Sequence, residues 1–242
     1  MKVIYEPKGR ALEYSALACN LYMGCSHGCA YCYAPGCMRT TKEKWHGSVV
    51  PRKNVIAQFE SDAKKLAGDP RPILFCFLTD PYQEAERHER LTRQALELVS
   101  RYKLRSQILT KGYNDIISED LDLMADIGTE LGLTISFMDD RKRTTWEPFA
   151  SPITDRLKTL QQAHERGIFT WVSLEPVIDP QEALQLIEHA SGFVHYWKVG
   201  KLNHMKAIES QVDWKKFLHE VESLLQSKNA KYYIKKDLLE YA

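Results

Sequence analysis

The chain has 242 residues, of which 44% are hydrophobic and 27% charged, and its formal net charge is +1 at pH 7. This composition is ordinary for a soluble globular protein, and neither disulfides nor oligomerisation is needed to explain its stability. The near-neutral charge excludes a global basic excess of the kind that indicates a nucleic-acid partner. It does not exclude a local basic groove, because net charge does not show where the charges lie.

The start of the chain and its cysteines bear on its location. Residues 1–10 alternate charged and apolar types and lack the apolar core of a signal peptide. No apolar run approaches the length of a membrane span, so we expect no membrane partner and a cytoplasmic location. Because cytoplasmic thiols are normally reduced, the six cysteines are candidates for metal ligands or catalysis rather than for disulfides.

Predicted helices and strands alternate along most of the chain. Helical spacing predicts helices at 54–66, 88–99, 118–127, 154–166, 181–189 and 212–226. Short apolar runs predict strands at 73–78, 106–109, 133–137, 169–174, 193–199 and 232–234. Strands of this kind between helices are typical of a parallel sheet that helices cover.

About six such units fit the length, short of the eight of a closed barrel. We therefore predict an open, partial (β/α)6 barrel of the TIM type, with a doubly wound flat sheet as the alternative, because periodicity cannot distinguish curvature. The expected organisation is a single domain over 1–242, with an extended lead-in at 1–16, a barrel core at 17–200, and a C-terminal helix and short strand at 201–242.

Polar residues recur where the predicted strands end. They are Thr79-Asp80, Thr110-Lys111, Ser136, Glu175 and Lys198. Any one of them is an ordinary residue at the start of a loop, but together they follow five successive strands. In parallel α/β architectures ligands bind at the carboxyl ends of the strands, so these positions predict a binding site.

Three cysteines, Cys25, Cys29 and Cys32, stand within eight residues of one another in a glycine-containing loop. Three thiolates can hold three irons of a [4Fe-4S] cluster and leave one iron open to the amino and carboxylate groups of S-adenosylmethionine (SAM). A structural zinc site or an electron-carrier cluster would require a fourth ligand, which Cys37 or His27 could supply. The spacing of Cys25, Cys29 and Cys32 is unusual for a zinc site, which favours the iron–sulfur interpretation.

This motif, with an aromatic residue before its last cysteine, resembles the signature of the radical SAM superfamily. Residues 20–34 (NLYMGCSHGCAYCYA) resemble the spore photoproduct lyase-related branch, often labelled DNA repair photolyase-like. Further similar segments are TDPYQ at 79–83, LTR at 91–93, Thr110-Lys111, and Glu147-Pro148 with Arg156. The resemblance spans roughly residues 5–200.

The resemblance implies a radical SAM enzyme that cleaves SAM reductively to a 5′-deoxyadenosyl radical and abstracts hydrogen from a substrate, such as a nucleobase, a nucleotide or a DNA lesion. It implies a one-electron reductant such as flavodoxin or ferredoxin as partner. The alternative, from another class, is a non-enzymatic zinc-binding or adaptor protein that uses the same cysteines.

The resemblance also implies roles for individual residues. Tyr31 would pack beside the SAM adenine, Lys111 would pair with the SAM carboxylate, and Ser136 would donate a hydrogen bond to SAM. The SAM amino group would lie near Thr79 and Asp80.

Three further residues, Arg156, Glu175 and Lys198, are candidates for substrate contact, and Tyr33 matches a tyrosine linked to radical relay. The hydrogen-donor position of the lyases falls on Phe77 here, one residue after Cys76. A shift of one residue turns a strand side chain to the opposite face, so Cys76 is expected to face the helices unless a bulge restores it. This weakens thymine-dimer repair as the specific reaction.

Overall fold

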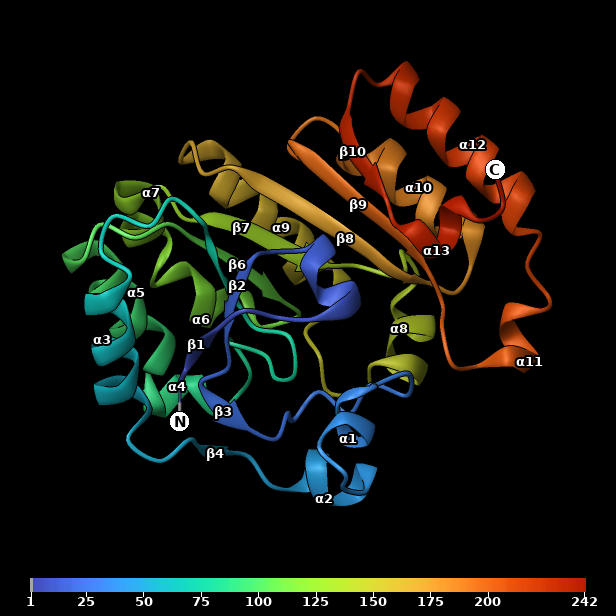
Figure 1. Ribbon diagram of the computed structural model, residues 1–242. Coiled ribbons are helices and arrows are strands. Elements are labelled where there is room, and N and C mark those ends of the chain that lie inside the picture. Colours follow the sequence, from blue (N-terminus) through green and yellow to red (C-terminus); the bar gives the residue numbers. More distant parts are fainter. Residues whose placement is uncertain (1) are drawn as a thin grey trace.

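The computed structural model describes residues 2–242 and is built on one curved sheet (Figure 1). The sheet has eight strands in the order β1-β2-β5-β6-β7-β8-β9-β10. They are β1 (Ile4–Tyr5), β2 (Leu17–Cys19), β5 (Ile73–Phe75), β6 (Ser106–Thr110), β7 (Glu130–Thr134), β8 (Thr170–Val177), β9 (Tyr196–Lys201) and β10 (Lys231–Ile234). Only β1 is antiparallel to its neighbour, and the other pairs are parallel.

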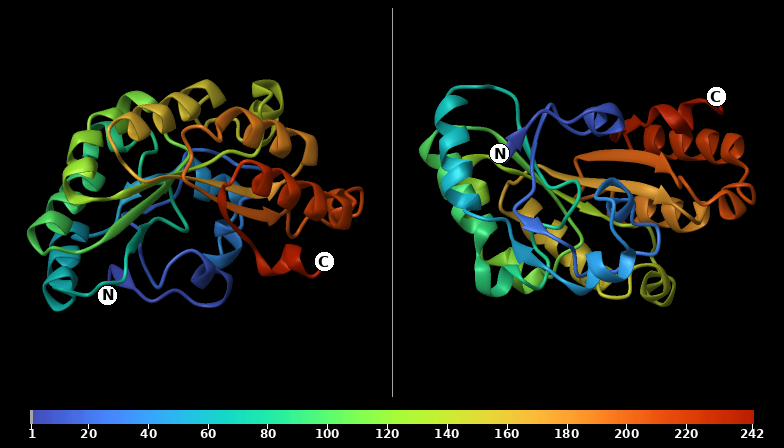
Figure 2. Two further views of the ribbon diagram at one scale, coloured as in Figure 1. Left: turned by 90° about the horizontal axis from the view of Figure 1, so that it is seen from above. Right: turned by 60° about the horizontal axis from the view of Figure 1, so that its bottom comes forward.

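The sheet is a partial barrel that does not close. Strands β2 and β5 to β9 follow one another in chain order, and β10 and the antiparallel β1 extend the two edges. The six predicted strands correspond to β5 to β10. Among the described residues no pairing joins β1 to β10. Figure 2 shows the curvature, so the prediction of an open (β/α)6 barrel is confirmed and the flat sheet is excluded.

Helices cover the convex side of the sheet (Figure 2, left). The longer ones are α3 (Val55–Lys65), α5 (Leu91–Arg101), α7 (Leu121–Ile127), α9 (Ile153–Glu165), α10 (Pro180–Ala190) and α12 (Trp214–Ser227). The core lies between them and the sheet, as where the ring of Phe59 on α3 meets that of Phe75 on β5, with centroids 5.8 Å apart. Burying each such side chain contributes about 1.5–3 kcal/mol. Within residues 2–242, no helix combines the length and apolarity that crossing a bilayer requires.

The concave side carries no such layer of long helices. The lead-in crosses it through the 3-10 helix η1 (Gly9–Glu13), and the cysteine loop lies beside it (Figure 2). We call residues 34–54 the wrapping segment. It contains α1 (Ala34–Cys37), α2 (Lys42–Gly47) and β4 (Val50–Pro51), and β4 pairs with β3 (Tyr22–Met23) just before the loop. The remaining short helices are α4 (Glu86–Glu89), α6 (Asn114–Ser118), α8 (Asp140–Trp146), α11 (Lys206–Glu209) and α13 (Lys236–Leu239).

The strand predicted at 133–137 is misplaced by three residues. Strand β7 spans 130–134 rather than 133–137, so Ser136 lies two residues beyond its end. In the structure Gly132 lies inside the strand because the Trp171 ring of β8 occupies the place of a side chain. An added Cβ would lie 2.1 Å from that ring.

Replacing Gly132 by Ala tests this packing. The methyl group would overlap the buried Trp171 ring, so we expect the free energy of unfolding to fall by about 1–3 kcal/mol, measured by denaturant titration. The matched control is Gly192→Ala, whose Cβ would meet nothing within 4 Å. Equal stability of the two variants would contradict the close contact.

Candidate functional site

The cysteine loop follows β2 and is held from outside by the wrapping segment. Gly24 has a φ of +87°, and a Cβ there would lie 2.0 Å from the Ser48 carbonyl oxygen, so glycine is required. The Cys25 amide donates to the Trp45 carbonyl at 3.2 Å, and Nδ1 of His46 lies 2.8 Å from the Cys25 carbonyl oxygen. The loop backbone is therefore fixed around its first cysteine.

The three motif thiols lie within electrostatic reach of one another. Cys25 and Cys29 are buried and Cys32 is half-buried. Burial raises the pKa of all three thiols, that of Cys29 to about 12, and the neighbouring thiols raise the pKa of Cys25 further. The Lys111 ammonium lowers the pKa of the Cys29 and Cys32 thiols and so partly offsets the effect of burial. Thiolates here would repel one another, so a bound cation or metal cluster would stabilise them.

The same residues do not form a single-ion site. Among residues 2–242, no group of three or more His, Cys, Asp or Glu side chains is placed to hold one metal ion. His27, a proposed fourth zinc ligand, has its Nε2 3.1 Å from Asp80 Oδ2, and Cys37 is exposed on α1.

Asp80, which follows β5, has four partners for its two carboxylate oxygens. Oδ1 accepts from the Thr110 hydroxyl at 2.5 Å and the Tyr82 amide at 2.8 Å, and Oδ2 accepts from the Lys111 amide at 2.7 Å and lies 3.1 Å from His27. Burial alone would raise the pKa of Asp80, but His27 and the hydrogen bonds outweigh it and lower the pKa to about 2. Asp80 thus joins the cysteine loop to the ends of β5 and β6.

Tyr31 is fixed by a buried ion pair. Its hydroxyl donates to Glu147 Oε1, and Glu147 Oε2 lies 2.6 Å from Arg156 Nη1, with both charged side chains fully buried. Arg156 also donates to the Ser151 and Thr134 carbonyls at 3.0 and 2.9 Å. Arg156 therefore lies beneath Tyr31 rather than on an open surface, and we assign it to positioning Tyr31 instead of contacting substrate.

Lys111 and two hydroxyl groups provide the polar atoms that a ligand would require. The Lys111 Nζ lies 5.6 Å from the centroid of the Tyr31 ring. Burial alone would lower the pKa of Lys111, but Cys29 and Glu147 raise it above its ordinary value, so its charge is retained. The buried hydroxyls of Thr79 and Ser136 have no hydrogen-bond partner within residues 2–242. Because an unsatisfied buried hydroxyl costs about 1–3 kcal/mol, a polar ligand that bonds to them would be favoured.

The concave face carries a second group of side chains, which sequence reasoning found only in part. Predicted Glu175 and Lys198 meet there around Tyr14 of the lead-in. Its hydroxyl donates to Glu175 at 2.5 Å, and the Lys198 Nζ lies 4.6 Å from its ring centroid. Lys235, which follows β10, pairs with Glu175 at 3.0 Å. The lead-in has no periodicity and Lys235 lies far along the chain, so neither Tyr14 nor Lys235 gave a sequence signal.

Tyr33 and Cys76 lie on different sides of the sheet. Tyr33 is half exposed and its hydroxyl donates to the Phe77 carbonyl at 2.7 Å, and Phe77 packs edge-on against Tyr14 on the concave face. Cys76 packs with Cys19 in the main core, on the side of the helices. The structure therefore brings Tyr33, but not Cys76, to the concave face.

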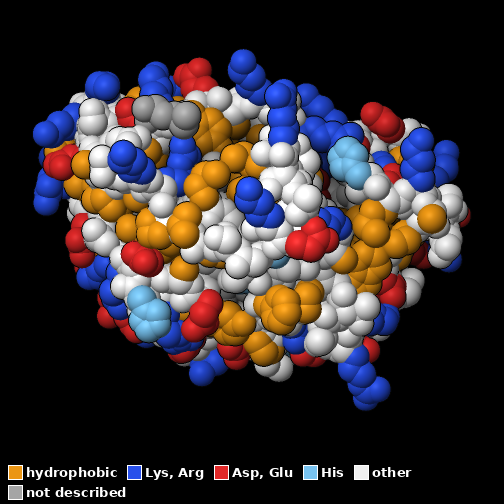
Figure 3. All heavy atoms as spheres, turned by 90° about the horizontal axis from the view of Figure 1, so that it is seen from below, with side chains coloured by type: hydrophobic (Ala, Val, Ile, Leu, Met, Phe, Trp, Pro, Cys, Tyr) orange, Lys and Arg blue, Asp and Glu red, His pale blue; other side chains and the backbone are white. Residues whose placement is uncertain are grey.

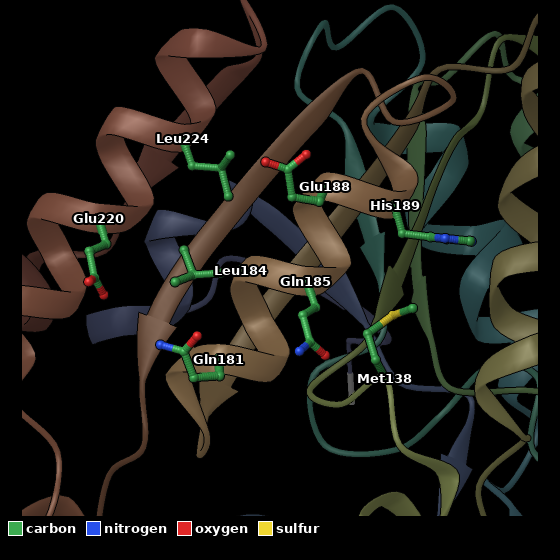
Figure 4. Close-up of a pocket in the computed structure, with 8 residues that line it drawn as sticks. All are labelled: Met138, Gln181, Leu184, Gln185, Glu188, His189, Glu220 and Leu224. Atoms are coloured by element: carbon green, nitrogen blue, oxygen red, sulfur yellow. The ribbon is translucent and has the colours of Figure 1, made fainter.

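One surface hollow lies away from these residues. It has a volume of about 670 Å³ and lies between α10 and α12 on the outside of the molecule (Figure 4). Its lining residues are Met138, Gln181, Leu184, Gln185, Glu188, His189, Glu220 and Leu224. None of them is a predicted site residue, so this hollow is separate from the cysteine loop.

Comparisons with curated proteins find relatives that are themselves uncharacterized. A protein of Methanocaldococcus jannaschii is 28% identical over 187 residues, which is 76% of this chain and 69% of that protein. A protein of Mycobacterium tuberculosis is 28% identical over 138 residues, which is 54% of this chain and 38% of that protein.

Among solved structures, a spore photoproduct lyase variant has a TM-score of 0.72 at 13% identity, covering 95% of this chain and 79% of that chain. Streptococcus suis SuiB bound to S-adenosylmethionine has a TM-score of 0.66 at 12% identity, covering 90% of this chain and 49% of that chain. These similarities show a shared fold.

The family model of the radical SAM superfamily matches residues 19–193. The match spans the cysteine loop and the carboxyl ends of β5 to β8, where the site described above is built. The chain therefore belongs to the radical SAM superfamily.

Proposed function

We propose that this radical SAM enzyme holds its [4Fe-4S] cluster on Cys25, Cys29 and Cys32 and abstracts hydrogen from a substrate on the concave face of the sheet. The family uses this cluster together with SAM. When both are bound, they supply a 5′-deoxyadenosyl radical. The observation that carries the proposal is the gathering of the three thiols beside Lys111, with two unsatisfied buried hydroxyls at the neighbouring strand ends.

The chain's own residues would bind and orient SAM. Lys111 offers a cation to its carboxylate, and Tyr31 offers an aromatic face to the adenine. Thr79 and Ser136 offer hydroxyls that lack partners in the protein. Asp80 already accepts three hydrogen bonds from the protein, so we propose that it positions the loop and Lys111 rather than touching SAM.

We propose a nucleobase, a nucleotide or a DNA lesion as substrate, bound on the concave face. The half-buried rings of Tyr14 and Phe77 pack edge-on against each other there, with the buried Trp171 ring next to Tyr14, and accessible aromatic rings of this kind stack with bases. Lys198 lies against two of those rings, where its ammonium would pair with a phosphate. Spore photoproduct lyase, which shares the fold, has been solved in complex with dinucleoside spore photoproduct. Tyr33 borders this face and is the proposed relay residue.

The proposed setting is the cytoplasm, with a flavodoxin or ferredoxin as one-electron donor. All six cysteines are free, as in proteins of reducing compartments.

The test begins with anaerobic reconstitution of the purified chain with iron and sulfide. Dithionite and SAM are then added and 5′-deoxyadenosine is quantified. A screen of nucleosides, dinucleotides and lesion-bearing DNA follows, with deuterium transfer from substrate into 5′-deoxyadenosine as the readout. Iron and sulfide content with SAM cleavage is the expected result, whereas one bound zinc without turnover would contradict the proposal.

Replacing Cys25, Cys29 or Cys32 singly by Ala is expected to abolish SAM cleavage, because each thiolate would hold a different iron. Iron content, sulfide content and the yield of 5′-deoxyadenosine are the measurements. The matched control is Cys37→Ala, an exposed cysteine five residues after Cys32, which should retain cleavage. Retained cleavage in a motif variant would remove that cysteine from the ligand set.

Replacing Lys111 by Ala should weaken SAM binding about tenfold or more while leaving the iron content near that of the wild type, because a buried charge-assisted contact is worth roughly 1.5–3 kcal/mol. Equilibrium binding of SAM to the reconstituted chain is the readout. Lys64→Ala, on the outer surface of α3, serves as the control. Unchanged affinity in the Lys111 variant would show that the ammonium does not contact SAM.

A further inference from the structure

The wrapping segment has a local excess of positive charge. Its acidic residues are limited to Glu43, whereas its basic residues are Arg39, Lys42, Lys44, Arg52 and Lys53. The whole chain, by contrast, has a formal net charge of only +1. Such a concentration of one sign attracts oppositely charged partners.

Four of these cations are exposed. We call Arg39, Lys42, Lys44 and Lys53 the basic surface. None of the four takes part in a salt bridge with residues 2–242, although exposed cations elsewhere, such as Arg87 and Lys142, are paired with acids. The charge of the basic surface is therefore available to a partner molecule.

The basic surface lies at the most accessible cysteine of the motif. Cys32 alone of the three is not fully buried, and it directly precedes α1. Lys42 donates from its Nζ to the Ala30 carbonyl within the cysteine loop. An electron that arrives through the basic surface would thus have a short path to the loop.

Exposed apolar side chains accompany these charges. Met23 and Val50 face each other across the β3–β4 pair and are 38% and 51% exposed. Figure 3 looks onto this side of the molecule, where hydrophobic side chains gather in patches and Lys and Arg lie around them together with some Asp and Glu. A small apolar centre with a charged rim is typical of transient protein interfaces.

We propose that the basic surface, with Met23 and Val50, docks an acidic one-electron donor protein of the flavodoxin type. This inference rests on the proposed function, since it requires a cluster on the cysteine loop. A single electron would pass from the reduced flavin to the cluster, with no atom transferred. Weak electron-transfer complexes are small and are steered by charge, which suits an exposed patch of unpaired cations.

A protein donor fits this surface better than a nucleic acid does. The wrapping segment holds the cysteine loop from outside through Trp45, His46 and Ser48. The proposed substrate face lies on the other side of the loop, where Tyr33 reaches Phe77. The electron donor and the substrate would therefore approach the loop from different sides, so both can be bound together.

The test compares Lys44→Glu/Lys53→Glu with a matched control, Lys158→Glu/Lys215→Glu, which reverses two exposed and unpaired lysines on α9 and α12. Lys42 is left intact because it contacts the loop. Calorimetry measures binding of oxidised flavodoxin to each reconstituted chain at low and high salt. SAM cleavage is then driven either by reduced flavodoxin or by dithionite.

We expect the first variant to lose affinity for flavodoxin on the order of tenfold at low salt, with a smaller difference at high salt. Its flavodoxin-driven cleavage should fall in proportion while its dithionite-driven cleavage matches that of the wild type. Equal affinity in both variants, or loss of affinity for a single-stranded oligonucleotide instead of flavodoxin, would overturn the docking proposal. Absence of dithionite-driven cleavage in the wild type would count against the proposed function rather than against docking.

Discussion

The buried Asp80 carboxylate is the constraint on which the candidate site depends. It accepts hydrogen bonds from Tyr82, Thr110 and the Lys111 amide and contacts His27 of the cysteine loop. A buried carboxylate is tolerated only when its charge is met in this way. This requirement fixes the ends of β5 and β6 and the cysteine loop relative to one another. The thiols and the Lys111 side chain are therefore held next to one another.

The second constraint is charge balance beneath Tyr31. Glu147 and Arg156 are both fully buried, and each balances the charge of the other across a 2.6 Å contact. Glu147 holds the Tyr31 hydroxyl, and Lys111 lies over the same ring. The ring thus has one orientation, with its aromatic surface next to the cation that would meet the SAM carboxylate. Conformational freedom is removed before any ligand binds, which lowers the entropic cost of binding.

What the sequence could predict depended on how local each signal was. The cysteine spacing lies within one loop, and the positions of Thr79, Lys111 and Ser136 follow from the rule that parallel strands place their carboxyl ends together. The strand that contains Gly132 was predicted three residues too late in the chain. Its packing partner Trp171 is 39 residues away, and only the fold brings the two together. Arg156 looked like a substrate contact because nothing in the sequence shows its burial against Glu147. The lead-in residue Tyr14 belongs to no periodic element, so its place among Glu175, Lys198 and Lys235 required the structure.

The central claim is that three protein thiolates leave one iron of the cluster free for SAM. Mössbauer spectroscopy of the chain reconstituted with iron-57 tests it most directly, by comparing spectra before and after SAM is added. The account predicts that one iron in four changes its spectrum as SAM binds and that the other three do not. Four irons that are equally unaffected by SAM, or a cluster with a fourth protein ligand, would contradict it.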